Sequence, residues 1–342
     1  MNFDTSHWHY CYGKPLGTGL LKQHPEDFIV REQLGYSPCG EGEHIYLWVR
    51  KTGLNTANVA EQLARFAGVH PRNVSFSGRK DKHAVTEQWI GVHLPGKQDP
   101  DWQSFAMPGV EILKAIRHNR KLRTGTHKFN DFILTIRELS QPDEVTDRLN
   151  ALTAGVPNYF GEQRFGNRNG NLFLGARLLD GETIRDRQKR SMAISALRSW
   201  LFNEFVSCRL AESGSKQALD GDVMLLQGSN SFFCAEQWSD ELQQRLQEGD
   251  IHFSAPMWGQ GELASRAQAL LFESTVASHH QALCEGLAAL GLSQERRALM
   301  QYPEQLQWQI EGQQLQLSFR LQAGGFATAV TRELFNPTPH QD

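Results

Sequence analysis

The chain has 342 residues, more than the usual size of one domain, and a chain this long can bury a large core without disulfides. Its hydrophobic (39%) and charged (21%) fractions are those of a globular protein, and no apolar run approaches the ~20 residues that span a bilayer. Five separated cysteines without a CxxC pair, and an N-terminus that is neither basic nor apolar, predict a cytoplasmic protein without a disulfide framework, signal peptide or membrane association.

The first ~150 residues alternate short β-like runs with helical patterns. The β-like runs are 28–32, 45–50, 74–76, 88–94 and 132–137. Residues 55–67 predict a helix, because Val59, Leu63 and Phe66 recur at helical spacing and Gly68 follows the last turn. A second helix is predicted at 143–153.

The composition changes at 155–166, where Gly, Pro, Asn and aromatic residues indicate an ordered loop or a domain boundary. Beyond it the patterns are mainly helical, at 192–210, 262–290 and 293–300, with one hairpin predicted at 223–234. The tail returns to alternation, and two half-buried strands are expected on either side of Glu311-Gly-Gln. A β-rich start and end around a helical middle predict one domain interrupted by another.

The net charge of −3 conceals two basic stretches, 112–130 and 185–198, while acidic residues collect at 238–250. Local positive charge of this kind fits a nucleic-acid surface, because binding depends on the local field. Each stretch alone is more typical of a solvated helix face.

The segment FSGRKDKHAVTEQW, residues 76–89, places one acid, Asp81, among four potential cations between two predicted strands. Neighbouring cations favour the charged form of a carboxylate, which can then act as a nucleophile or a base. Surplus cations can hold the phosphates that flank a reacting group. The residues alone also allow a charged hairpin turn with a local ion pair.

Histidines supply the candidate metal ligands, as His7-Trp-His9 and His279-His280, but neither has a carboxylate or cysteine at ligand spacing. These histidines are therefore interpreted as surface or capping residues. No redox or nucleotide motif with the required spacing occurs either. We predict no metal and no cofactor.

Several segments match one set of motifs in order. Gly78-Arg-Lys-Asp-Lys-His-Ala-Val-Thr-Glu-Gln fits GxKDKxAxTxQ, Lys22 opens a fit to KxxPEDFxV, and His118 opens a fit to HxRKLRxG followed by Asn130-Asp-Phe132. Pro157-Asn-Tyr-Phe-Gly-Glu-Gln-Arg-Phe-Gly fits PNYFGxQRFG, and 186–202 and 323–334 fit two further motifs. Together these segments span nearly the whole chain and resemble the tRNA pseudouridine synthase D (TruD) family.

The resemblance implies an α+β fold with a mixed, mainly antiparallel sheet, in which residues 1–154 and 303–342 form a pseudouridine synthase catalytic domain. An inserted α/β TRUD domain is expected at 155–302. Three positions depart from the family pattern: Phe129 and Gly325 stand for the usual Gly and Ser, and Gln322 for the usual Pro. These departures concern loop geometry and do not touch the implied catalytic residues.

The implied activity is isomerisation of a specific uridine in tRNA to pseudouridine, with uridine 13 of glutamate tRNA as the family target. Asp81 would do the chemistry, Lys22 would pair with it and Phe132 would stack on the base. Whether Asp81 attacks C1′, adds to the ring or removes the 2′-proton is left open. The residues expected to bind RNA or support the site are Arg79, Lys80, Lys82, Asn130, His118, Arg120, Lys121, Arg123, Asn158, Arg164, Phe165, Arg187, Lys189 and Arg190.

The sequence leaves two other functions open. One is an RNA-binding or chaperone module whose synthase site is idle. The other is an enzyme that cleaves the glycosidic bond and releases the base. The expected partner is tRNA, and no obligate protein partner is evident from the sequence.

Overall fold

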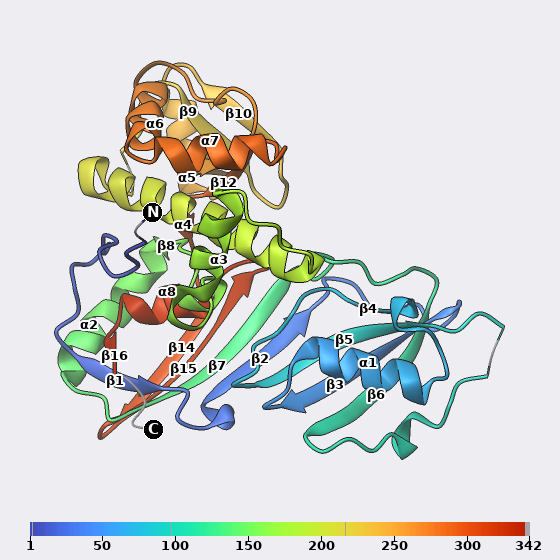
Figure 1. Ribbon diagram of the computed structural model, residues 1–342. Coiled ribbons are helices and arrows are strands. Elements are labelled where there is room, and N and C mark those ends of the chain that lie inside the picture. The colour runs from blue at the N-terminus through green and yellow to red at the C-terminus, as the bar shows by residue number, and fades with distance from the viewer. Residues whose placement is uncertain (2, 97, 216, 339–342) are drawn as a thin grey trace. The chain divides into compact units, whose positions relative to one another are not determined.

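The computed structural model describes residues 1, 3–96, 98–215 and 217–338 (Figure 1). The chain divides into two compact units. Unit 1 comprises Met1–Pro15, Ala154–Tyr302 and Gly325–Glu333, and unit 2 comprises Leu16–Thr153, Pro303–Gly324 and the residues from Leu334 on. The predicted division differs from these units at 1–15 and 325–333, which pack with unit 1 in the structure.

Unit 2 is built on one sheet, which has ten strands among the described residues. The central path runs in the order β14-β15-β7-β2-β5-β3-β6, with β1 paired to β7 and β16, and β4 paired to β5. Only the β2–β5 and β1–β16 pairs of these described strands are parallel. The strands are β1 (Thr18–Leu21), β2 (Phe28–Gln33), β3 (His44–Thr52), β4 (Val74–Phe76), β5 (Val85–His93), β6 (Val110–His118), β7 (Phe129–Arg137), β14 (Glu304–Glu311), β15 (Gln314–Gln322) and β16 (Asn336–Pro337).

Helix α1 (Thr56–Phe66) covers part of this sheet, and α2 (Pro142–Ala151) follows β7. The apolar residues Ile45, Leu47 and Val49 alternate along β3 and are buried in one cluster with Val59 and Leu63 of α1. Because side chains alternate across a strand, the same spacing leaves the intervening residues on the opposite face. The predicted helix at 55–67 and the predicted strands of this unit are confirmed within two or three residues at their ends.

The charged segment around Asp81 lies between two strands, as the sequence predicted. Strand β4 ends at Phe76 and β5 begins at Val85, and the two pair antiparallel from Phe76↔Ile90 onward. Asp81 therefore lies in the loop 77–84. Both flanking strands belong to the central sheet, which gives this loop two rigid ends.

Unit 1 is organised around α4 (Arg187–Ser213), whose buried residues Leu197, Leu201 and Phe205 lie in the main apolar cluster. The Asp186 carboxylate caps this helix by accepting from the backbone N–H groups of Gln188 and Lys189. Around it lie α3 (Gly170–Leu179), α5 (Asp240–Gln247), α6 (Ala267–His279), α7 (Gln281–Ala289), α8 (Ala327–Arg332), the sheet β10-β9-β11-β12 and the pair β8–β13. These strands are β8 (Val156–Pro157), β9 (Asp222–Leu226), β10 (Phe232–Ala235), β11 (Ile251–Met257), β12 (Glu295–Ala298) and β13 (Met300–Gln301).

Two of the predictions for this region need correction. The hairpin at 223–234 is confirmed by the antiparallel pair β9–β10, but the pattern at 262–290 contains two helices, α6 and α7. The helix predicted at 293–300 is wrong, because this segment forms β12 and β13. Its Glu, Arg and Ala residues favour helix by propensity, yet β12 pairs with β11 over four residues and its arginines have buried partners.

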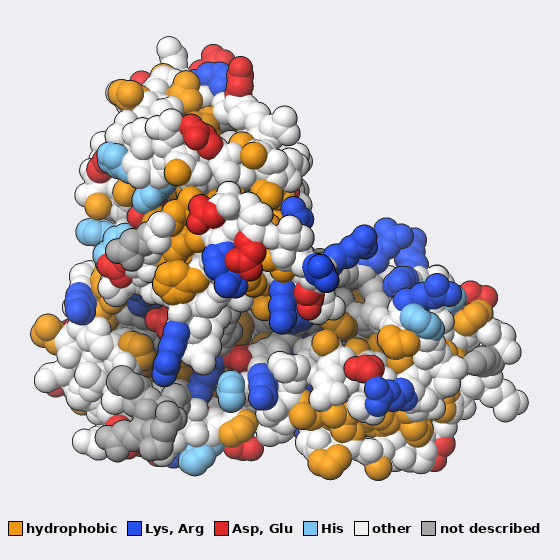
Figure 2. All heavy atoms as spheres, in the orientation of Figure 1, with side chains coloured by type: hydrophobic (Ala, Val, Ile, Leu, Met, Phe, Trp, Pro, Cys, Tyr) orange, Lys and Arg blue, Asp and Glu red, His pale blue; other side chains and the backbone are white. Residues whose placement is uncertain are grey.

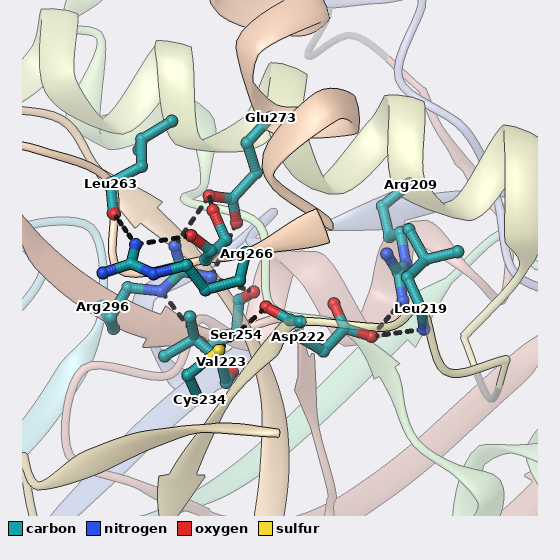
Figure 3. A network of polar contacts seen from close by, with 12 residues as sticks. Arg209, Leu219, Asp222, Val223, Cys234, Ser254, Leu263, Arg266, Glu273 and Arg296 are labelled. Atoms are coloured by element: carbon teal, nitrogen blue, oxygen red, sulfur yellow. Dashed lines mark hydrogen bonds and ion pairs between the residues drawn. The ribbon is translucent and has the colours of Figure 1, made fainter. Parts of the chain in front are cut away.

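A buried network of charges supplies the partners of Arg296 (Figure 3). The Arg296 guanidinium of β12 donates to both oxygens of Glu273 on α6, at 2.8 and 3.1 Å, and to the backbone oxygen of Ser254 on β11. Nearby, Arg209 of α4 pairs with Asp222 at the start of β9 at 2.7 Å. A helical 293–300 would remove Arg296 from Glu273, so the tertiary contact overrides the local preference.

We expect Glu273→Gln to lower the free energy of unfolding by about 3–5 kcal/mol, because it leaves the buried Arg296 charge without its carboxylate. Urea unfolding would measure this loss. Glu182→Gln is the matched control, since its pair with Arg177 is exposed and should contribute less than about 1 kcal/mol. Equal losses in the two variants would contradict a structural role for the buried pair.

Candidate active site

Unit 2 brings together two residues that lie 59 positions apart in the sequence, Lys22 and Asp81. The Lys22 Nζ donates to the Asp81 Oδ2, and both side chains are largely buried, at 13% and 15% exposed. Lys22 directly follows β1, and Asp81 lies in the 77–84 loop. A largely buried, charge-assisted hydrogen bond of this kind holds a carboxylate in one position.

The backbone of Lys22 adopts the left-handed conformation, with φ 63°. This conformation is unfavourable for a residue with a Cβ and persists where the surroundings impose it, often at functional sites. The Lys22 ammonium also lies 4.0 Å from the ring centroid of Phe28 at the start of β2. These two constraints fix the direction from which the ammonium reaches Asp81.

Phe132 of β7 belongs to a cluster of three rings. It stacks on Phe319 of β15 with centroids 5.4 Å apart and meets the edge of Phe28 at 6.1 Å. The Lys22 ammonium lies over the ring of Phe28, so the cluster connects the Phe132 ring to the ion pair. Phe132 is only 7% exposed, which leaves a small part of the ring for an incoming base.

The charge around Asp81 is less unbalanced than the sequence predicted. Lys80 is buried and pairs with Glu32 of β2 at 2.8 Å, and its Nζ also donates to the Asn130 Oδ1 at 2.7 Å. Burial raises the pKa of Glu32, and the Lys80 charge opposes that effect. Lys80 and Asn130 thus support the loop from inside the protein, which is one of the two roles expected for them.

Further hydrogen bonds attach the loop to its surroundings. The Thr56 Oγ1 accepts from the Lys80 N–H at 3.0 Å and donates to Gln88, whose amide donates to the Gly78 carbonyl at 3.1 Å. His127 contacts the Ser77 hydroxyl, and burial lowers the pKa of His127 to about 4, so its ring is neutral at physiological pH. The loop that carries Asp81 is therefore held at three residues that precede the carboxylate, Ser77, Gly78 and Lys80.

Sequence reasoning missed Lys51 and Glu32. Lys51 lies near the end of β3, is fully buried, and donates from its Nζ to the backbone carbonyls of Asp81 at 2.8 Å and Leu54 at 2.7 Å. A signal existed for Glu32, since alternation places it on the same face as Phe28 and Val30. The same signal existed for Lys51, since alternation places it on the face of Ile45, Leu47 and Val49, although a lysine at the end of a strand is ordinarily solvated.

Exposed cations of unit 2 lie in this loop and in a later segment that a hydrogen bond from the Gly125 N–H to the Ser77 carbonyl joins to it. Lys and Arg side chains gather on the visible face of unit 2 around β4 (Figure 2). The exposed predicted residues of this unit are Arg79, Lys82, Arg120, Lys121 and Arg123. His118 differs from them, because it is buried, stacks on Tyr36 and accepts a hydrogen bond from the Cys39 N–H. His118 therefore supports the structure of unit 2 from inside.

The predicted residues of unit 1 fall into two groups. Asn158, Arg164 and Phe165 are packed: Asn158 bonds to the Ala298 carbonyl and Arg297, Phe165 is fully buried, and burial lowers the pKa of Arg164. The exposed group lies at the start of α4 and consists of Arg187, Lys189 and Arg190.

Arg198, at the end of the second basic stretch, does not belong to an open basic surface. Its guanidinium donates to the carbonyls of Met257, Trp258 and Ser293 and pairs with Glu295. The basic stretch that can meet a polyanion therefore ends before Arg198.

Two features are absent from the described residues. No group of three or more His, Cys, Asp or Glu among them is arranged to hold a metal ion. No helix within those same residues has the length and apolar character needed to cross a membrane.

Comparison with known proteins gives consistent results along the whole chain. The family model described as tRNA pseudouridine synthase D (TruD) matches residues 5–187 and 184–334. A protein named tRNA pseudouridine synthase D from Pseudoalteromonas atlantica is 52% identical over 337 residues, which cover 97% of this chain and 96% of that protein. A protein of the same name from Aeromonas salmonicida is 49% identical over 326 residues, covering 95% and 93%.

The fold has a solved counterpart. A crystal structure named for tRNA pseudouridine synthase D (TruD), from Methanosarcina mazei, superposes with a TM-score of 0.69 and covers 98% of this chain and 96% of its own. The two sequences are only 20% identical, so this likeness concerns the fold alone. It supports an α+β architecture with mixed, mainly antiparallel sheets.

Proposed function

The chain belongs to the tRNA pseudouridine synthase D (TruD) family, and we propose that it isomerises one specific uridine in tRNA to pseudouridine with Asp81 as the reacting carboxylate. One observation carries the assignment to Asp81. Lys22 and Asp81, which match two separate family motifs, form a direct, largely buried ion pair. A largely buried ion pair contributes little net stability, because the cost of desolvating its charges offsets their attraction.

The reaction requires a charged carboxylate close to the sugar and base. The bond between N1 and C1′ breaks, the uracil turns, and C5 forms the new bond to C1′; C5 loses its proton and N1 gains one, so atoms and charge balance. Asp81, held by Lys22, would assist by attack at C1′, addition to the ring or removal of the 2′-proton. Phe132 would contact the base with the part of its ring that Phe319 leaves open.

A uridine inside folded RNA must leave its stack to reach Asp81, at a cost of a few kcal/mol. Contacts to RNA phosphates would offset that cost, and the exposed cations supply them. In unit 2 these are Arg79, Lys82, Arg120, Lys121 and Arg123, and in unit 1 Arg187, Lys189 and Arg190. Uridine 13 of a glutamate tRNA, the family target, is the substrate to test first.

A tritium-release assay tests this function directly. In tRNA labelled at uracil C5, pseudouridine formation releases the label to water. Free uracil in the products would instead indicate cleavage of the glycosidic bond, and tight binding without chemistry would indicate an RNA-binding module. Mapping pseudouridine in RNA from a strain that lacks the protein would then identify the target.

Lys121→Ala and Arg190→Ala should each weaken tRNA binding, because each removes one exposed cation from the proposed footprint. The slope of log Kd against log salt concentration should flatten by about one for each variant. Arg65→Ala is the control, since Arg65 is exposed on α1 and already paired with Glu61. Binding that matches the wild type at low and high salt would exclude these two residues from the footprint.

A further inference from the structure

Lys51 is a fully buried ammonium group beside the catalytic loop. It lies at the end of β3, and its Nζ donates to the backbone carbonyl of Asp81 itself at 2.8 Å and to that of Leu54 at 2.7 Å. Burying an ammonium group is costly, and an apolar residue of similar length is usually better tolerated in a core. The presence of a charge at this position therefore calls for a reason other than packing.

The charges that face Lys51 come from the Asp81 loop. The charges of Lys51 and the Asp81 carboxylate attract each other, and Lys51 also bonds directly to the Asp81 peptide. Lys80 also faces it, but Lys80 is paired with Glu32. Burial lowers the pKa of Lys51 to about 8, with Lys80 acting in the same direction and the Asp81 charge opposing it.

We propose that Lys51 is a positioning residue of the reaction: its ammonium fixes the peptide carbonyl of Asp81, while Lys22 fixes the carboxylate. The inference rests on the proposed role of Asp81. Two cations then hold one residue at two points, from β3 and from the end of β1. A displacement of the reacting group by about 1 Å can cost roughly 10²-fold in rate, so a charge-assisted bond to this peptide is functionally significant.

This arrangement makes opposite predictions for activity and stability as the pH rises. Lys51 in the folded protein loses its proton near pH 8, whereas an unfolded lysine keeps it to about pH 10.5. Between these values the unfolded state binds more protons, so this residue contributes a gain in stability with rising pH. The rate should fall over the same interval, because the neutral amine holds the Asp81 carbonyl less strongly.

The test compares the full-length wild type with Lys51→Met, Lys51→Gln and the surface control Arg65→Met, using single-turnover tritium release from labelled tRNA at pH 6–10. Lys51→Met should be about 10- to 100-fold slower at pH 7, with the Kd for tRNA changed less than threefold. Lys51→Gln retains an N–H donor without the charge and should recover part of the rate. Arg65→Met should match the wild type.

Above about pH 8 the rate of the wild type should fall and the contribution of Lys51 to its thermal stability should rise. Lys51→Met should show neither of these two pH effects. A Lys51→Met rate within twofold of the wild type would overturn the inference. A wild-type rate that stays constant to pH 10 in the folded protein would also overturn it, and this second test does not depend on the variants folding. A wild type that releases no tritium would instead overturn the proposed function, and this inference with it.

Discussion

Asp81→Asn should reduce the single-turnover rate of pseudouridine formation by at least about 10³-fold, the largest effect expected of any substitution in this chain. Asparagine has the shape of aspartate and can still accept a hydrogen bond from Lys22, so the loop 77–84 should keep its conformation. The substitution removes the charge and with it the ability to act as a nucleophile or a base. Tritium release from labelled tRNA measures the rate.

The control for this experiment is RNA binding. The tRNA Kd of Asp81→Asn should stay within about threefold of the wild type, because the exposed cations of the proposed footprint are unchanged. Loss of binding together with loss of rate would mean that the substitution disturbed the RNA surface. A variant that still forms pseudouridine at near the wild-type rate would remove Asp81 from the chemistry and, with it, the proposed mechanism.

The strands around Asp81 could be predicted from the sequence, because local patterns determine them. Alternation in β3 and helical spacing in α1 each depend on residues that are neighbours in the chain. The position of Asp81 between β4 and β5 followed from the same patterns. Its pairing with Lys22 came from resemblance to a family, since spacing alone does not bring residues 59 positions apart together.

The residues that sequence reasoning missed depend on the order of strands in the sheet. Glu32 meets Lys80 because β2 lies beside β5, and Lys51 meets the Asp81 peptide because β3 lies on the other side of β5. No local pattern encodes these neighbours. The wrong helix at 293–300 has the same origin, since Arg296 reaches Glu273 only when that segment forms β12.

The second large effect is expected for Lys22→Met, which should slow the reaction by about 10²-fold. Methionine keeps an unbranched apolar stem over Phe28 but cannot hold the carboxylate of Asp81, so the reacting group loses both its fixed position and its counter-charge. Single-turnover tritium release measures the loss. Lys22→Arg keeps the charge in a longer, planar group and should recover only part of the rate.

Stability measurements can separate an effect through Asp81 from a direct contact of Lys22 with RNA. If Lys22 acts through the carboxylate, the losses of unfolding free energy caused by Lys22→Met and Asp81→Asn should not add in the double variant. The coupling energy between the two substitutions, measured by urea unfolding, should be about 0.5–3 kcal/mol. If Lys22 instead contacts RNA, the stability effects should add and Lys22→Met should weaken tRNA binding. The ion pair is direct and largely buried, which favours the first outcome.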